Sequence, residues 1–553
     1  MLILRPNLLS MKSRLTLLLT IVSLTVFAQP AKINNENKPK LVVGVVVDQM
    51  RWDYLYRYSE RYGTDGFKRL LREGFSCENT FIPYTPTYTA AGHTCVYTGS
   101  VPSFHGIMGN SWYNKALKRN VYCTEDDSVQ TVGSTSSAGK MSPKNLWANT
   151  ITDELRLATN FRNKTIAIAL KDRGAILPGG HTANGAYWFD NANGQFISST
   201  FYMNSLPQWV QNFNAKHLPD TYLKQGWKTL YPINTYVQST EDNKSYENPI
   251  PGEDNTFDHN TDAITKNKYE SFRSTPYGNT LTFEMAKAAV EAEQLGKSGL
   301  TDFLTISFSS TDYIGHAFGP NSIEAEDCYL RFDRELGDFL KYLDSKVGKG
   351  NYLLFLTADH GAAHNVEFSK EHKLPAGVLD DADIKKNLDV LLESAFGVKQ
   401  IIAQVINYQI YLNDEIIASS KLNRAAINQF IIQELLKYPG IAKAFEINQL
   451  NDLMLPGPLK MMVANGYNQK LSGEIQFVFK PQWYDSWSTK GTTHGVWSPY
   501  DAHIPLLWFG WNIKPGKLNR KVYMTDIAPT VAALLRIQTP NATIGEVIEE
   551  VSK

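Results

Sequence analysis

The chain has few cysteines and no excess of either charge. Four cysteines in 553 residues exclude a small disulfide-built scaffold and a cysteine-rich zinc ribbon. Lysine and arginine together number 55, against 55 acidic residues, so the basic excess typical of nucleic-acid binding is missing and we expect no nucleic acid as a partner. With 43% hydrophobic and 20% charged residues, the chain can bury a large core, which excludes a disordered or collagen-like protein.

Long apolar runs are also missing, apart from one near the N-terminus. Lys12 and Arg14 precede the apolar run 15–27, and Ala28 follows it, a pattern typical of a secretory signal peptide. The run is short for a membrane span, although an uncleaved N-terminal anchor stays open as an alternative. We therefore predict a signal peptide at 1–28 and a mature chain at 29–553 that is periplasmic or secreted and has no membrane contact.

Three apolar runs rich in β-branched or bulky residues predict strands buried on both faces: 41–47 (LVVGVVV), 303–308 (FLTISF) and 352–356 (YLLFL). Helical patterns lie between and after these runs. The alternation predicts an α/β fold with a doubly wound, mostly parallel sheet and helices on both faces. In such sheets, ligands bind at the carboxyl ends of the strands.

The predicted helices span 279–295, 322–347, 425–436 and 526–535, the last with Thr525 as its N-cap. Two long stretches do not follow the alternation of strands and helices. We predict that the regions 180–275 and 368–485 are insertions that form a cap or side region over the edge of the sheet.

An acidic residue follows each predicted strand: Asp48, Asp312 and Asp359. Because the carboxyl ends of parallel strands meet at one edge of a sheet, we expect the three carboxylates to cluster. Taken singly, an aspartate after a strand is more often a turn residue or a helix cap. The coincidence of three such residues favours a metal site.

Histidines accompany these acids. His316 follows Asp312 in DYIGH, His360 follows Asp359 in DHG, and His494 lies far along the chain in GTTHG. Carboxylates and neutral imidazoles suit zinc or a similar first-row metal, and this many groups suit two ions better than one. We expect His93 and His364 to pack nearby or to support the ligands rather than bind metal.

Thr89 is the candidate nucleophile, in the segment PTYTAAGHTCVYTG. Pro83 and Pro86 keep the approach extended, and a helix is expected from Thr89 to Gly99. Local sequence alone favours Thr89 as a simple N-cap. A helix N-terminus also binds phosphate, and an adjacent metal would lower the pKa of the hydroxyl, so Thr89 could instead be a nucleophile.

Taken together, these motifs resemble the alkaline phosphatase superfamily and, more narrowly, the PafA-type zinc-dependent alkaline phosphatases. The members of that group are exported monoesterases that use a threonine nucleophile. The superfamily has an α/β sandwich fold. The matching stretches run from about residue 41 to residue 535: VVVDQMRWDYL, PTYTAAGHTCVYTG, HGIMGNSWY, LKDRGAILPGGH, TPYGNTLTFEMAKAA, SFSSTDYIGHAFGPNS, LTADHG, GTTHG and TDIAPT. Their order and spacing make the resemblance specific.

The resemblance implies two Zn²⁺ per chain and assigns a role to each site residue. One zinc would be held by Asp312, His316 and His494. The other would be held by Asp48, Asp359 and His360, with the Thr89 oxygen completing its shell. Asn110, Lys171 and Arg173 would bind the phosphoryl oxygens. The link after His494 (GVWSPY) is longer than expected, which affects the loop geometry rather than the ligand.

The resemblance implies hydrolysis of small phosphate monoesters through a covalent phosphothreonine, and we expect a monomer. A nucleotide pyrophosphatase/phosphodiesterase is the nearest alternative, and the Lys171/Arg173 pair argues for the monoesterase. A sulfatase would need a cysteine or serine in C/S-x-P-x-R, where this chain has Thr89-Ala90-Ala91-Gly92. A phosphoglycerate mutase-like enzyme would use serine and manganese. A non-catalytic metal-binding exported protein is the alternative from another class.

Overall fold

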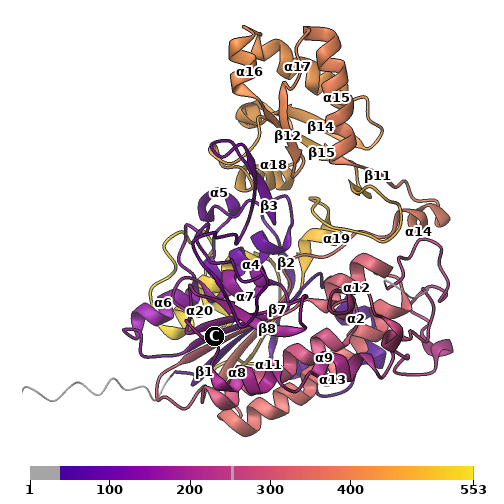
Figure 1. Ribbon diagram of the computed structural model, residues 1–553. Coiled ribbons are helices and arrows are strands. Elements are labelled where there is room, and N and C mark those ends of the chain that lie inside the picture. Colours follow the sequence, from indigo (N-terminus) through magenta and orange to yellow (C-terminus); the bar gives the residue numbers. More distant parts are fainter. Residues whose placement is uncertain (1–37, 251–254, 552–553) are drawn as a thin grey trace, which may run out of the picture. The chain divides into compact units, whose positions relative to one another are not determined.

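Among the residues that the computed structural model describes (38–250 and 255–551), eleven strands form one central sheet (Figure 1). Its middle is parallel. The adjacent strands there are, in order, β10 (Tyr352–Thr357), β1 (Leu41–Val47), β9 (Asp302–Phe308), β6 (Thr165–Ala169) and β7 (Gly185–Asp190). Every residue of β1, β9 and β10 is buried, as their continuous apolar runs predict.

Antiparallel strands extend both edges of this parallel middle. On the β10 side lie β18 (Leu506–Gly510), β2 (Phe75–Phe81) and β17 (His503–Ile504), with β19 (Gly516–Tyr523) running parallel to β2. On the β7 side lie β8 (Gln195–Ser199) and β5 (Thr131–Val132). The prediction of an α/β fold with a mostly parallel sheet is confirmed.

Helices cover both faces of the sheet. The residues Ser307 and Phe308 are neighbours on β9 and therefore point to opposite faces. Ser307 contacts His93 of α4 (Thr89–Thr98), with Ser307 Oγ 2.7 Å from His93 Nε2. Phe308 packs against Phe283 of α11 (Tyr277–Ala292), with ring centroids 4.2 Å apart. The helix α7 (Asp172–Gly179) contacts α4, and the helix α13 (Ile323–Leu343) contacts α11.

Most predicted helices form, with shifted ends. The N-cap of α13 is Ser322, whose hydroxyl accepts a hydrogen bond from Ala325 N. The prediction that Thr525 caps the last long helix is wrong. A 3₁₀ turn at Met524–Asp526 precedes α20 (Ile527–Leu535), so Asp526 is the cap position. The Asp526 carboxylate accepts from Tyr523 N at 2.9 Å, which fixes this tight turn before the helix.

Part of the region 180–275 belongs to the main sheet, which corrects the prediction that all of it is an insertion. The strands β7 and β8 both lie in this region, and β7 pairs in parallel with β6. All six residues of β7 (GAYWFD) are buried, although glycine and aspartate weaken the strand pattern in the sequence. The short helices α8 (Gln208–Asn214), α9 (Leu218–Leu223) and α10 (Lys268–Phe272) follow.

The region 368–485 contains a second sheet of its own. Four antiparallel strands in the order β12 (Ile402–Ile406), β13 (Gln409–Leu412), β15 (Ile475–Phe479) and β14 (Ile441–Glu446) form it. The helices α15 (Asp381–Phe396), α17 (Arg424–Leu435) and α18 (Gly457–Asn465) belong to the same region. We call this region the cap; the domain boundaries themselves stay a prediction.

The predicted signal peptide at 1–28 lies outside the described residues. Within the described part of the chain, no helix combines the length and the apolar character needed to cross a membrane.

Candidate active site and metal centre

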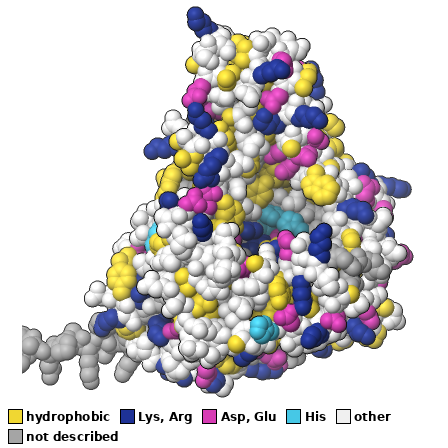
Figure 2. All heavy atoms as spheres, in the orientation of Figure 1, with side chains coloured by type: hydrophobic (Ala, Val, Ile, Leu, Met, Phe, Trp, Pro, Cys, Tyr) yellow, Lys and Arg dark blue, Asp and Glu magenta, His cyan; other side chains and the backbone are white. Residues whose placement is uncertain are grey.

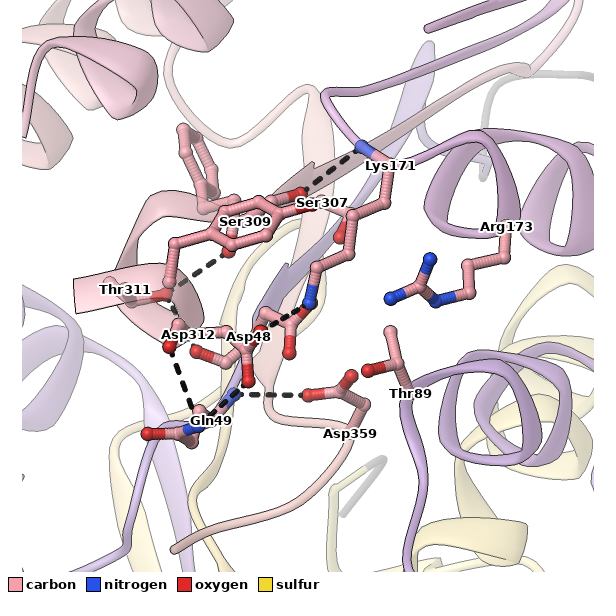
Figure 3. Close-up of polar contacts among 12 residues, drawn as sticks. Asp48, Gln49, Thr89, Lys171, Arg173, Ser307, Ser309, Thr311, Asp312 and Asp359 are labelled. Carbon is pink, nitrogen blue, oxygen red and sulfur yellow. Dashed lines mark hydrogen bonds and ion pairs between the residues drawn. The ribbon is translucent and has the colours of Figure 1, made fainter. Parts of the chain in front are cut away.

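The three strand-terminal aspartates lie together at the carboxyl edge of the parallel strands. Asp48 follows β1, Asp359 follows β10, and Asp312 lies in α12 (Ser310–Phe318) directly after β9. All three are buried. Gln49 connects them: its side-chain amide donates to Asp312 Oδ1 at 2.7 Å and its backbone N–H donates to Asp359 Oδ1 at 3.2 Å (Figure 3).

Two groups of potential ligands converge at this edge. The ligand atoms of Asp312, His316 and His494 all lie within 4.8 Å of one another. The same holds for those of Asp48, Asp359 and His360. These are the two sets named from the sequence, so the structure brings all six residues into the predicted groups. In Figure 2, histidine and basic side chains line a hollow on this face of the molecule.

Each of the three histidines is oriented by a backbone carbonyl. The Nδ1 atoms of His316, His360 and His494 lie 2.8 Å from Thr492 O, 3.0 Å from Gly361 O and 2.7 Å from Thr87 O, respectively. A carbonyl can only accept, so Nδ1 carries the proton in each neutral imidazole and the Nε2 lone pair faces the cluster, at His360 within 3.2 Å of the Thr89 hydroxyl.

The Nε2 atoms face carboxylate oxygens. His316 Nε2 lies 3.2 Å from Asp312 Oδ1, and His360 Nε2 lies 3.4 Å from Asp48 Oδ1. Where the imidazole is neutral, its lone pair and the carboxylate repel each other at such distances unless a cation lies between them. Although burial opposes a charge there, Asp312 raises the pKa of His316, so a proton on Nε2 fills this place at His316 when no metal is bound. This donor set therefore fits metal ions.

Unpartnered oxygens support the same fit. Asp48 Oδ1 and Asp359 Oδ2 are buried and accept no hydrogen bond from any described residue. Burial and the neighbouring carboxylates of Asp312 and Asp359 raise the pKa of Asp48 well above its usual value. Burial, with His360 and His316 nearby, holds the pKa of His494 well below its usual value, which keeps the imidazole neutral. Cations at these positions would relieve the crowding of negative charge.

Lys171 connects the two groups. Its ammonium lies 2.7 Å from Asp48 Oδ2 and 2.5 Å from Asp312 Oδ2, and its side chain is buried. Although burial opposes its charge, Asp312 and Asp48 raise the pKa of Lys171 above its usual value. Lys171 is therefore a cation fixed between the two candidate metal positions.

Thr89 opens α4 with its hydroxyl directed at the cluster (Figure 3). Its Oγ1 lies 3.2 Å from His360 Nε2. The alternative that Thr89 is a simple N-cap does not hold, because Tyr88 occupies the cap position and Thr89 is the first helical residue. The Thr89 side chain is thus not used to cap its own helix, and it lies beside the positive end of the helix dipole.

The other predicted substrate-binding residues surround Thr89. Asn110 Oδ1 accepts from Ala90 N at 3.0 Å, which leaves the amide N–H groups to donate elsewhere. The Arg173 guanidinium points toward Thr89 and the carboxylates (Figure 3). Its Nη1 donates to Tyr122 Oη at 3.0 Å, and its buried Nε has no hydrogen-bond partner in the part of the chain that the structure describes. An anion bound here could accept from both side chains.

Sequence reasoning missed several residues of this site. Gln49 follows Asp48 directly and has a φ of 66°, a backbone conformation that no sequence pattern marks. Tyr122, which orients Arg173, lies on a short strand far from the recognised motifs. His93 has the supporting position expected for it: its Nδ1 lies 3.3 Å from Asp359 Oδ2. His364 contacts Arg51 and Asn321 rather than the carboxylates.

The sequence and the fold were compared with those of known proteins. A family model described as type I phosphodiesterase / nucleotide pyrophosphatase matches residues 42–500. Alkaline phosphatase PhoV of Synechococcus elongatus is 54% identical over 517 residues, 93% of this chain and 93% of PhoV. A Myroides odoratus protein named calcium-transporting ATPase is 54% identical over 518 residues, 93% of this chain and 94% of that protein.

Alkaline phosphatase PafA of Elizabethkingia meningoseptica is 51% identical over 525 residues, 94% of this chain and 96% of PafA. A crystal structure of wild-type PafA covers 93% of this chain and 99% of its own, with a TM-score of 0.91 and 51% identity. The fold and nearly the full length of the chain are therefore common to these proteins.

Proposed function

We propose, from the premise that the chain belongs to the type I phosphodiesterase / nucleotide pyrophosphatase family and is a PafA-like alkaline phosphatase, that it hydrolyses phosphate monoesters through a phosphothreonine on Thr89 at a two-zinc site. The chain is a phosphomonoesterase, since its relatives PhoV and PafA are alkaline phosphatases and its structure matches that of PafA. The covalent intermediate, the metal and its count are the proposed part.

One observation carries the proposal. The imidazoles of His316, His360 and His494 each donate Nδ1–H to a backbone carbonyl. Their lone pairs therefore converge with carboxylates in two groups, and the Thr89 hydroxyl lies beside one of them. Two such groups of carboxylates and imidazoles, at the distances that one ion could span, support two bound metal ions, and this donor set favours zinc.

When bound, two Zn²⁺ would supply the positive charge that lowers the pKa of a nearby hydroxyl and neutralises the leaving oxygen. Thr89 Oγ then attacks phosphorus in line with the leaving group: the Oγ–phosphorus bond forms and the ester phosphorus–oxygen bond breaks. The Thr89 proton goes to solvent, and the leaving oxygen takes a proton from solvent to depart as the alcohol. Water later cleaves the phosphothreonine, so two inversions give net retention. The transition state is loose, so positioning and charge carry most of the rate acceleration.

Basic groups select the monoester. A monoester dianion has a charged oxygen where a diester has a second ester group. The side chains of Lys171 and Arg173 both extend toward the space beside the Thr89 hydroxyl (Figure 3), where they could donate to such oxygens. Asn110, held against the start of α4, can donate to a third oxygen. The diester substrate of a nucleotide pyrophosphatase has an uncharged ester group in this place, so Lys171 and Arg173 would not help to bind it.

Parallel assays with an aryl phosphate and a bis-aryl phosphate test the proposal. We expect faster turnover of the monoester, and Thr89→Ala protein serves as the blank for contaminating phosphatases. Faster hydrolysis of the diester would favour the nucleotide pyrophosphatase/phosphodiesterase alternative. Activity that ignores a chelator and added zinc would argue against the metal mechanism, and no activity on either ester would favour a non-catalytic metal-binding protein.

We further propose that the mature chain, 29–553, forms one catalytic domain and acts as an exported monomer. The basic residues, apolar run and small residue at 11–28 support export.

A further inference from the structure

Asp501 lies outside every motif considered so far, in the short helix α19 (Pro499–Ala502) that follows the His494 loop. Its side chain is fully buried. The Oδ2 atom accepts hydrogen bonds from Gly495 N and from Val496 N, both at 2.9 Å. A buried carboxylate oxygen with two backbone donors fixes the loop directly after His494.

The same loop is tied to the segment that leads to Thr89. Gly495 N also donates to Thr87 Oγ1 at 3.1 Å, and the Thr87 hydroxyl donates to Val496 O at 3.2 Å. In return, His494 Nδ1 donates to Thr87 O at 2.7 Å. The position of the imidazole therefore depends on how the loop and Thr87 are held together.

Glycine makes this close approach possible. Gly495 has a φ of 120°, in the left-handed region that favours glycine, and a Cβ there would lie 2.2 Å from Tyr408 Oη. The backbone of Asp501 adds a third connection, because its carbonyl accepts from Gly361 N, next to His360, at 2.7 Å. Thr87 Oγ1 also lies 3.5 Å from Asp501 Oδ2. Asp501 thus contacts three segments: those of Thr87, His494 and His360.

We propose that Asp501 is a positioning residue for the active site, whose carboxylate holds His494 and the approach to Thr89 in the geometry that binds metal. This inference rests on the two-zinc site proposed above. The side chain acts on the His494 loop, whereas only the backbone reaches Gly361. Loss of the side chain should therefore affect one zinc and spare the other.

The test is the release of zinc from purified protein into a chelating indicator, together with kcat and KM on an aryl phosphate. In Asp501→Ala, we expect one of two zinc ions to be held about 10–100-fold more weakly, the range for lost partners of metal ligands. The other zinc should be released as in wild type. The value of kcat should fall with little change in KM, because Asn110, Lys171 and Arg173 do not contact Asp501.

Two further variants separate geometry from charge. Asp501→Asn keeps an acceptor oxygen of the same shape, and we expect it to retain zinc far better than Asp501→Ala. Thr87→Val keeps the volume but removes the hydroxyl between Gly495 and Val496, and we expect it to weaken the same zinc. If Asp501→Ala does not fold, zinc release from Thr87→Val tests the role of the His494 loop instead.

Asp333→Ala is the matched control. Asp333 is also a buried carboxylate with two backbone donors, Gly63 N and Phe67 N, both at 2.7 Å, and it lies on α13. We expect this variant to lose thermal stability with unchanged zinc release and kcat.

Wild-type zinc release in Asp501→Ala and Thr87→Val would overturn the inference, as would equal losses in Asp501→Asn and Asp501→Ala. Wild-type protein that binds fewer than two zinc ions would overturn the proposed function instead.

Discussion

The Lys171 ammonium bridges Asp48 and Asp312, one carboxylate from each of the two candidate metal groups, at 2.7 and 2.5 Å. All three side chains are buried. Lys171 therefore partly compensates the negative charge that metal ions would otherwise neutralise. It can also donate to a phosphoryl oxygen bound between the groups, so one side chain connects the stability of the site with its chemistry.

Lys171→Met tests this connection through stability. Removing one partner of a buried ion pair costs about 3–5 kcal/mol because a charge is left uncompensated. We expect that loss in zinc-free protein and a smaller loss in zinc-loaded protein, measured by thermal unfolding with and without zinc. Lys341→Met is the control, since Lys341 and Asp65 form an exposed pair whose loss should change the stability little. Equal losses with and without zinc would contradict the account.

Thr89 variants test the nucleophile. Thr89→Ala should abolish the acid-stable phosphoenzyme, because no hydroxyl remains beside His360, whereas Thr89→Ser should retain it. Acid quenching during turnover of an aryl phosphate, followed by peptide mass spectrometry, measures the phosphorylated residue. Phosphate trapped on Thr89→Ala protein would place the nucleophile elsewhere.

Arg173→Ala tests the selection of monoesters. A charged hydrogen bond to an oxyanion is worth about 1.5–3 kcal/mol, so we expect the barrier for monoester hydrolysis to rise by that amount. Diester hydrolysis should change little, because the second ester group carries no charge. The control is Arg72→Ala, whose side chain is 54% exposed. Equal losses on the two substrates would refute the assigned role of Arg173.

Gly92→Ala tests the contact between α4 and the Asp359 segment. A Cβ at Gly92 would lie 2.5 Å from Asp359 O, so the helix that carries Thr89 would have to shift. Overpacking of this kind costs about 1–3 kcal/mol. Alanine is more favourable than glycine in an isolated helix by about 1 kcal/mol, which opposes this cost. Because the clash displaces Thr89, we still expect a lower kcat/KM.

Gly457→Ala is the control for this substitution, because no atom lies within 4 Å of a Cβ built there. Its kcat/KM should equal that of the wild type. Unchanged kcat/KM in Gly92→Ala would mean that the contact between α4 and Asp359 does not limit the geometry of Thr89.

The sequence predicts the carboxylate half of the site on physical grounds. Continuous apolar runs identify β1, β9 and β10, and parallel strands bring Asp48, Asp312 and Asp359 to one edge. Nothing local places His494 there. Its position depends on a hydrogen bond to Thr87 O and on loop contacts with Asp501, which join segments far apart in the chain. Only the family resemblance could assign it.

The expectations and alternatives that do not hold have a similar origin. Thr525 and Thr89 are reasonable N-caps by residue type, but a 3₁₀ turn moves one cap to Asp526 and an extended approach moves the other to Tyr88. The strands β7 and β8 contain glycine, aspartate, glutamine and serine, so their pattern does not stand out from a loop. Pairing of β7 with β6 decides their structure, and pairing is a long-range effect.

Anomalous X-ray scattering at the zinc edge, from crystals of the purified protein, tests the central claim most directly. The account predicts two zinc peaks, one bound by Asp48, Asp359 and His360 near Thr89 Oγ1, the other by Asp312, His316 and His494. A single peak, or zinc bound away from these six side chains in an active enzyme, would contradict it.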